Sequence, residues 1–236
     1  MFFIDWTYII LVLPALVFAM WASGRVNSTF KKYSAIPTRR NLTGADAARR
    51  ILFANGLYDV RVEHISGSLN DHFDPRTNTI RLSDATFSNT SAAAVGVAAH
   101  EAGHAVQYAN KYIPLKLRNA IVPVTNLGSK LSMPLILLGI ILSAFSEMYA
   151  YIAYAGVACF TLCVLFQLLT LPTEFNASKR AMKALASEGI LERSELHGAK
   201  KVLSAAAMTY VAALAVAFAQ LLRLLMIVAS NTRRRD

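Results

Sequence analysis

The chain has 236 residues, of which 55% are hydrophobic, and a formal net charge of +10. Its mean hydropathy of +0.42 is too apolar for the one or two soluble domains that the length alone would suggest, so we expect a membrane protein. The excess of positive charge is typical of a solvated face near anionic lipid headgroups. No motif that reads RNA or DNA accompanies it, so we expect no nucleic-acid partner.

Four segments are apolar enough to cross a bilayer, which needs about 20 apolar residues as a helix. The first has neither the basic start nor the cleavage site of a signal peptide, so we interpret it as a retained anchor. The second and third would form a helical hairpin through Glu147, and Arg223 in the fourth is expected to reach the lipid headgroups. The segments are Ile4–Ser23, Leu131–Ser146, Tyr149–Leu171 and Val202–Ala229.

The distribution of basic residues predicts the topology. Of the 24 Lys and Arg, 14 lie in residues 24–130 and 6 in residues 172–201, which four spans place on one side of the membrane. The positive-inside rule makes that side the cytoplasm. The Arg233–Arg235 tail opposes this arrangement, unless the last apolar segment bends back as an interfacial helix. Cys159 and Cys163 lie in the third span as expected packing residues, and nothing indicates a disulfide.

Between the first two spans, the sequence predicts a small mixed α and β unit. Gly24–Arg40 is expected to be a basic connector. Thr43, followed three residues later by Asp46, predicts the capped start of a helix that ends at Gly56. Alternating apolar residues predict two strands, which a turn would join into a hairpin. The segment that follows lacks helix-breaking residues other than glycine and predicts a helix. These elements cover residues 60–65, 67–78, 79–83 and 92–108.

The last of these helices contains VAAHEAGHAVQ, with the pattern His-Glu-x-x-His at His100, Glu101 and His104. Residues i and i+4 share one face of a helix, so both imidazoles can reach one metal ion. Zinc suits two such histidines, and a catalytic zinc site needs a third protein ligand and an open position for water. Glu101 could contact that water and act as a general base. The alternative, a stripe of satisfied histidines without metal, would bury costly polar groups among alanines.

The third ligand must come from elsewhere in the chain. The segment LPTEFNASKRAMKAL is the most suggestive, because Pro172 can open a helix and Glu174 would lie in its first turn. The four-span topology returns Glu174 to the same membrane side as His100. Alternatively, Glu174 is an ordinary carboxylate that the helix dipole favours at a helix start. Other carboxylates and three histidines are also candidates: His64, His72 and His197.

The segment AAHEAGHAVQ, together with DHFDP upstream and LPTEFNASKRA downstream, resembles the YugP-type membrane zinc metallopeptidases of bacteria over essentially the whole chain. The chain is more remotely similar to gluzincin peptidases such as HtpX, in which a glutamate on a later helix completes the site. This resemblance implies zinc as cofactor, His100, His104 and Glu174 as its ligands, and Glu101 as the base. HtpX-like enzymes have E-x-x-x-D, whereas this chain has Ser178 at the Asp position. The carboxylate that orients a ligand histidine there is therefore replaced or absent.

Further residues have weaker predictions. A turn is favoured over a cleft lining for Asp71, His72 and Asp74, because Asp and Pro prefer turns. Thr79–Ser83 is a candidate edge strand on which an extended peptide would pair, as in the gluzincins. The conceivable donors to an oxyanion are Tyr108, Tyr112 and His197.

We therefore expect a predominantly α fold: a membrane bundle of about four spans with a small α+β zincin-like catalytic unit, made of a short β-hairpin and the HExxH helix. The expected regions are a transmembrane anchor, a cytoplasmic catalytic region, a transmembrane hairpin, a cytoplasmic helix with the third ligand, and a transmembrane or interfacial helix. They cover residues 4–23, 24–130, 131–171, 172–201 and 202–229.

The expected function is a zinc-dependent endopeptidase of the bacterial inner membrane, with its active site facing the cytoplasm. Its expected substrates are peptides or unfolded and membrane-associated proteins. One alternative is a pseudo-peptidase scaffold that binds zinc and recruits partners. Another is a zinc transporter or sensor, which needs ionisable residues within the spans, and between Leu131 and Leu171 the sequence has only Glu147. The sequence indicates neither the oligomeric state nor the cleavage specificity.

Overall fold

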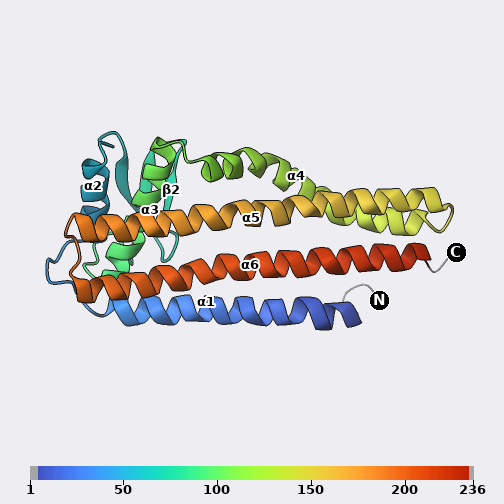
Figure 1. Cartoon of the computed structure of the whole chain (residues 1–236), viewed down its shortest axis with the longest axis horizontal. Helices are drawn as coiled ribbons and strands as arrows, with labels where there is room; N and C mark the ends of the chain where they lie inside the picture. The colour runs from blue at the N-terminus through green and yellow to red at the C-terminus, as the bar shows by residue number, and fades with distance from the viewer. Residues whose placement is uncertain (1–4, 234–236) are drawn as a thin grey trace. The chain divides into compact units, whose positions relative to one another are not determined.

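Four long helices contain most of the chain (Figure 1), which a computed structural model describes for residues 5–233. Three short strands and four shorter helical elements make up the rest of the regular structure in these residues. The fold is therefore predominantly helical with one small sheet, as expected. In chain order the elements are η1 (Tyr8–Val12), α1 (Leu13–Ser34), α2 (Gly44–Ala54), β1 (Arg61–Ile65), β2 (His72–Asp74), β3 (Thr79–Ser83), α3 (Ala92–Ala109), α4 (Ile113–Leu142), η2 (Glu147–Tyr149), α5 (Ala150–Ser187) and α6 (Arg193–Arg233).

Within residues 5–233, four helical segments are long and apolar enough to cross a membrane. Each exceeds the roughly 20 residues that a bilayer requires, which confirms the expected number of spans. They are Tyr8–Ser34, Ile113–Leu142, Glu147–Ser187 and Arg193–Asn231. Ile4 at the start of the predicted anchor lies outside the described residues, as do Arg234 and Arg235 of the predicted tail.

The chain forms two compact units, and α1, α4, α5 and α6 contribute residues to both. One unit contains Leu117–Leu171 and the described parts of Met1–Trp21 and Thr209–Asp236. The other contains Ala22–Lys116 and Pro172–Met208. Every residue of the predicted metal site lies in this second unit.

The second unit has its own apolar core, to which α2, β3, α3, α5 and α6 contribute buried side chains. The capping box predicted for α2 is present: the Asp46 N–H donates to the Thr43 hydroxyl, and the Thr43 N–H donates to the Asp46 carboxylate. On β3, Ile80 and Leu82 are fully buried in this core. The sheet is thereby held against the helices by its central strand.

The sheet has the strand order β1-β3-β2, which differs from the predicted hairpin. The two predicted strands both exist, but β1 and β3 pair in parallel, with Arg61 opposite Thr79. The hairpin forms instead between β2 and β3, which are antiparallel, with Phe73 opposite Ile80. The short β2 strand lies within the segment that was predicted to be only a turn, because its three residues are too few for a readable alternation.

All four long helices extend beyond the predicted spans, and α1 and α5 show why. Helix α1 continues to Ser34 through most of the predicted connector, because Phe30 is buried against Ala93 and Val202. Helix α5 runs without interruption through Pro172, so the prediction that Pro172 opens a helix was wrong. A proline removes one helical hydrogen bond, and burial of α5 side chains on its C-terminal side offsets that loss.

In the first unit, the two spans joined through Glu147 approach each other closely. A Cβ atom on Gly139 of α4 would overlap the backbone of Ala153 of α5, so only glycine permits this contact. Cys159 and Cys163 both lie on α5 as free thiols. The Arg223 side chain is 7% exposed, and its Nε lies 3.1 Å from Oδ1 of Asp5. This ion pair provides the charged partner that a buried guanidinium requires.

Candidate functional site

Helix α3 positions the His-Glu-x-x-His motif. It begins where the Ala94 N–H donates to the Ser91 hydroxyl oxygen at 3.2 Å, as a serine N-cap does. Alanines fill much of its length and favour the helix, and most of its residues are buried. The two histidines are therefore fixed on one face of a rigid element.

Helix α5 crosses α3 in the opposite direction at very short range. A Cβ atom on Gly103 would lie 2.7 Å from the carbonyl oxygen of Ala177. Four residues further along α3, the side chain of Gln107 reaches the carbonyl oxygen of Thr173, which is four residues earlier on α5. This antiparallel register brings Glu174 opposite His104. The glycine thus serves close helix packing.

Three possible metal-ligand atoms meet where the helices cross. The Nε2 atoms of His100 and His104 lie 3.1 Å apart, and Oε2 of Glu174 lies 3.2 Å from the first and 3.4 Å from the second. Ligands about 2.0–2.1 Å from a tetrahedral zinc ion are separated by about 3.3 Å, so these atoms already have the spacing that zinc requires. The side chain of Glu174 is 4% exposed. A buried, converging donor set of two imidazoles and a carboxylate fits zinc.

The other three histidines lie outside this cluster. His64 Nε2 lies 2.6 Å from Oδ1 of Asp84, and His72 Nδ1 lies 2.9 Å from the Asn70 carbonyl oxygen. His197 is exposed on α6. Of the third-ligand candidates that the sequence offers, the structure brings Glu174 to the paired histidines.

Each clustered histidine has a hydrogen-bond partner at its other ring nitrogen. The Nδ1 atom of His100 lies 3.1 Å from the hydroxyl of Ser178, and the Nδ1 atom of His104 lies 3.0 Å from Oε1 of Gln107. Ser178 occupies the position where HtpX-like sequences have Asp, so a hydroxyl replaces that carboxylate. Sequence reasoning did not identify Gln107, although its place three residues after His104 on a helix could have indicated it.

Glu101 lies on α3 beside the cluster and is 8% exposed. Its Oε2 atom accepts the backbone N–H of Phe73 at 3.0 Å. Burial raises the pKa of Glu101 to about 7, although the charge of His104 acts in the opposite direction. A carboxyl group with this pKa can both take and return a proton near neutral pH.

The two histidines differ in their affinity for a proton. Burial lowers the pKa of His100 below its ordinary value. Burial acts in the same direction on His104, but its hydrogen bond to Glu174 and the charges of Glu101 and Glu174 raise its pKa instead.

The other residues that were considered for the site make contacts that stabilise the fold. The carboxylate of Asp71 accepts the N–H and hydroxyl of Ser83, and that of Asp74 accepts the backbone N–H of Arg76. Both residues organise the segment around β2. The rings of Tyr108 and Phe73 pack with centroids 5.9 Å apart, and Arg180 lies over the ring of Tyr112.

The proposed peptide edge at Thr79–Ser83 is wrong. This strand is β3, the central one, so β1 and β2 occupy both of its edges. The edge that faces the candidate site belongs to β2, because the Phe73 N–H points toward Glu101.

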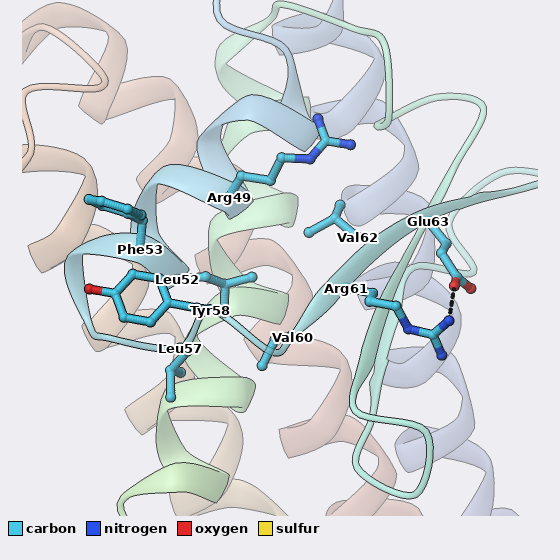
Figure 2. Close-up of a pocket in the computed structure, with 9 residues that line it drawn as sticks. All are labelled: Arg49, Leu52, Phe53, Leu57, Tyr58, Val60, Arg61, Val62 and Glu63. Carbon is cyan, nitrogen blue, oxygen red and sulfur yellow. Dashed lines mark ion pairs between the residues drawn. The ribbon is translucent and has the colours of Figure 1, made fainter.

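A hollow lies between α2 and β1 (Figure 2), with a volume of about 470 Å³. Apolar side chains line much of it, and the Arg61–Glu63 ion pair at 3.3 Å borders it. None of the clustered histidines or carboxylates lines this hollow. The grouping of chemically reactive side chains is therefore at the crossing of α3 and α5.

Two comparisons with known proteins found matches to this chain. A family model described as "Putative neutral zinc metallopeptidase" matches residues 8–229. A protein of Bacillus subtilis (strain 168), described as "Putative membrane protease YugP", is 45% identical over 220 residues, which is 93% of this chain and 96% of that protein. No solved structure matches the chain. The resemblance to YugP-type sequences is thereby confirmed.

Proposed function

The chain belongs to the neutral zinc metallopeptidase family, and from that premise we propose that it is an endopeptidase of the bacterial inner membrane whose zinc ligands are His100, His104 and Glu174. It is a membrane protein, its family uses zinc, and a protease acts on peptide substrates. The single observation that supports this proposal most strongly is the triangle of ligand atoms with edges of 3.1, 3.2 and 3.4 Å.

Zinc bound by these residues would polarise a peptide carbonyl and acidify water. The chain's own contribution is to place an acid–base group beside that position. Glu101 is buried next to the cluster, and we propose that its carboxylate takes a proton from the attacking water and delivers it to the leaving amine. Its bond to the Phe73 N–H holds the carboxylate on the β2 side of the site.

The edge of β2 that does not pair with β3 lies beside Glu101, which accepts the Phe73 N–H there. We propose that an extended peptide lies along this edge, which would bring a peptide bond to the catalytic group. We propose that substrates are peptides or unfolded and membrane-associated proteins. The basic residues in 24–130 and 172–201 support a cytoplasmic position for this unit.

The test compares Glu101→Gln with the unaltered protein in detergent. Gln retains the shape and the acceptor for the Phe73 N–H but cannot take a proton. We expect zinc content to be retained and peptide cleavage to fall by at least about a hundredfold. The inactive protein should also retain bound substrates, which mass spectrometry of co-purifying polypeptides would identify.

A scaffold without catalysis predicts a different result. In that case, expression of the Glu101→Gln variant in a deletion strain would fully restore the wild-type phenotype. The purified wild-type protein would cleave no peptide in a peptide library. Zinc flux into proteoliposomes that depended on Glu147 would support the transporter alternative.

The matched control for Glu101→Gln is Glu188→Gln. It removes a carboxylate near the end of α5 and should change neither zinc content nor peptide cleavage.

A further inference from the structure

We propose that Gln107 is a positioning residue that fixes the proton of neutral His104 on Nδ1 and so leaves Nε2 free to bind metal. This inference rests on the zinc site of the proposed function and deepens it. Gln107 is fully buried, and both ends of its amide make hydrogen bonds to groups beside the site. The direction of these hydrogen bonds determines which ring nitrogen of His104 carries the proton.

The orientation of the Gln107 amide follows from Thr173. The Nε2 atom of Gln107 lies 2.8 Å from the backbone carbonyl oxygen of Thr173, which can only accept a hydrogen bond. The amide nitrogen must therefore face Thr173, and the amide oxygen must face His104. Since that oxygen can only accept, the Nδ1 atom of His104, 3.0 Å away, must carry the proton.

A second set of contacts fixes the same orientation independently. The Nε–H of Arg180, which can only donate, points at Oδ1 of Asn176 at 2.7 Å. The same oxygen accepts the second hydrogen of Gln107 Nε2 at 3.0 Å. A flipped Gln107 amide would place its oxygen against two other oxygens. The donors thus run from His104 through Gln107 to Asn176, whose Oδ1 atom also accepts the hydrogen bond from Arg180.

The same amide also joins the two helices that supply the ligands. Gln107 belongs to α3, whereas Thr173 and Asn176 belong to α5 on either side of Glu174. Loss of its hydrogen bonds would leave buried polar groups unpaired and would loosen His104 relative to Glu174. Groups that orient a metal-bound histidine in this way typically contribute 10–100-fold to metal affinity.

Two variants separate the proton-directing role from simple packing. Gln107→Met and Gln107→Glu have similar volumes, and both lose the donors to Thr173 and Asn176. They differ in the atom that faces His104, because only Glu retains an acceptor for the Nδ1 proton. Asn110→Ala, an exposed position just after α3, is the control.

The first measurement is the zinc dissociation constant, obtained in detergent by competition with a chromophoric chelator. We expect Gln107→Met to weaken zinc binding about 10–100-fold and Gln107→Glu to restore at least part of that loss. Equal weakening by Met and Glu would show that Gln107 only packs the helices, and an unchanged constant in Gln107→Met would overturn the proposal.

The second measurement is the ¹⁵N spectrum of histidine-labelled, metal-free protein at about pH 9, where the imidazoles are neutral. The His104 signal, identified by its loss in His104→Gln, should show a protonated Nδ1 in the wild type and a mixture in Gln107→Met. A wild-type spectrum with the proton on Nε2 would overturn the proposal even if the variants did not fold. Wild-type protein that bound no zinc would refute the proposed function, while this spectrum would still decide the role of Gln107.

Discussion

The α-carbon of Gly103 lies so close to the carbonyl oxygen of Ala177 that an added Cβ atom would lie 2.7 Å from it. Real side-chain carbons do not approach backbone oxygens this closely. The contact sets the separation of α3 and α5, and one residue further along α3 it lets His104 reach Glu174. A packing detail thus determines whether the ligands converge.

Gly103→Ala should therefore separate the two helices. We expect a loss of about 1–3 kcal/mol in the free energy of unfolding from overpacking, together with a weaker zinc affinity. Chelator competition and denaturant titration in detergent would measure both. Gly24→Ala is the matched control, because an added Cβ there has no neighbour within 4 Å and alanine favours a helix. Unchanged zinc affinity in Gly103→Ala would contradict the importance of this contact.

Removal of the Glu174 carboxylate should abolish tight zinc binding. Glu174→Gln retains the shape but offers a weaker neutral ligand to a divalent cation, so we expect the affinity to fall at least about a hundredfold. The zinc content of purified protein, measured by mass spectrometry, checks this. If Glu174→Gln retained one tightly bound zinc ion, another residue would have to be the third ligand.

Ser178 should contribute through His100. Its hydroxyl lies 3.1 Å from Nδ1 of that ring, so Ser178→Ala removes the partner that orients the imidazole. We expect a loss of about tenfold in zinc affinity. Ser178→Asp, which restores the carboxylate of HtpX-like sequences, should bind zinc at least as tightly as Ser178→Ala. The reverse order would show that the position does not accept a carboxylate.

Asp74 makes stability depend on pH. The backbone N–H of Arg76, and then the side chains of Arg81 and Thr77, lower the pKa of Asp74 from 3.8 to about 2. A lowered pKa means that the ionised form favours the folded state, so this contribution is complete above the ordinary value and is lost as the pH falls toward 2. Asp74→Asn should therefore lower the melting temperature at pH 7 more than at pH 3. An equal effect at both values would exclude the charge as the cause.

The Arg223–Asp5 pair should stabilise the first unit. Removing either partner alone leaves a charge at a partly or fully buried position, which is costly in an apolar segment. In a double-mutant cycle with Arg223→Leu and Asp5→Asn, we expect a coupling energy of about 1 kcal/mol or more, since Asp5 is partly exposed. Reversible unfolding in detergent would measure it, and additive losses would show that the pair is not coupled.

Local signals were sufficient for part of this structure. The capping box of Thr43 and Asp46 predicted the start of α2, because its hydrogen bonds join residues three apart. Long apolar runs predicted four spans, because a bilayer imposes a length that composition alone reveals. In both cases the interacting groups are neighbours in the chain.

The incorrect predictions concern segments whose conformation depends on residues that are distant in the sequence. The parallel pairing of β1 with β3 depends on β2, a strand of three residues whose place in the sheet is set by contacts across the chain. Pro172 predicted a helix start, but α5 continues through it because its far side is packed in the core of the second unit. Local propensity is a weak guide where burial outweighs it.

The sequence by itself determined that His100 and His104 share a helical face, because their spacing alone places them there. Only the tertiary structure decided that Glu174 completes the cluster, and that Ser178 and Gln107 orient the two rings. The physical reason is that helical periodicity relates residues within a few positions of one another. A crossing between helices more than sixty residues apart depends on close packing, here through Gly103 against Ala177.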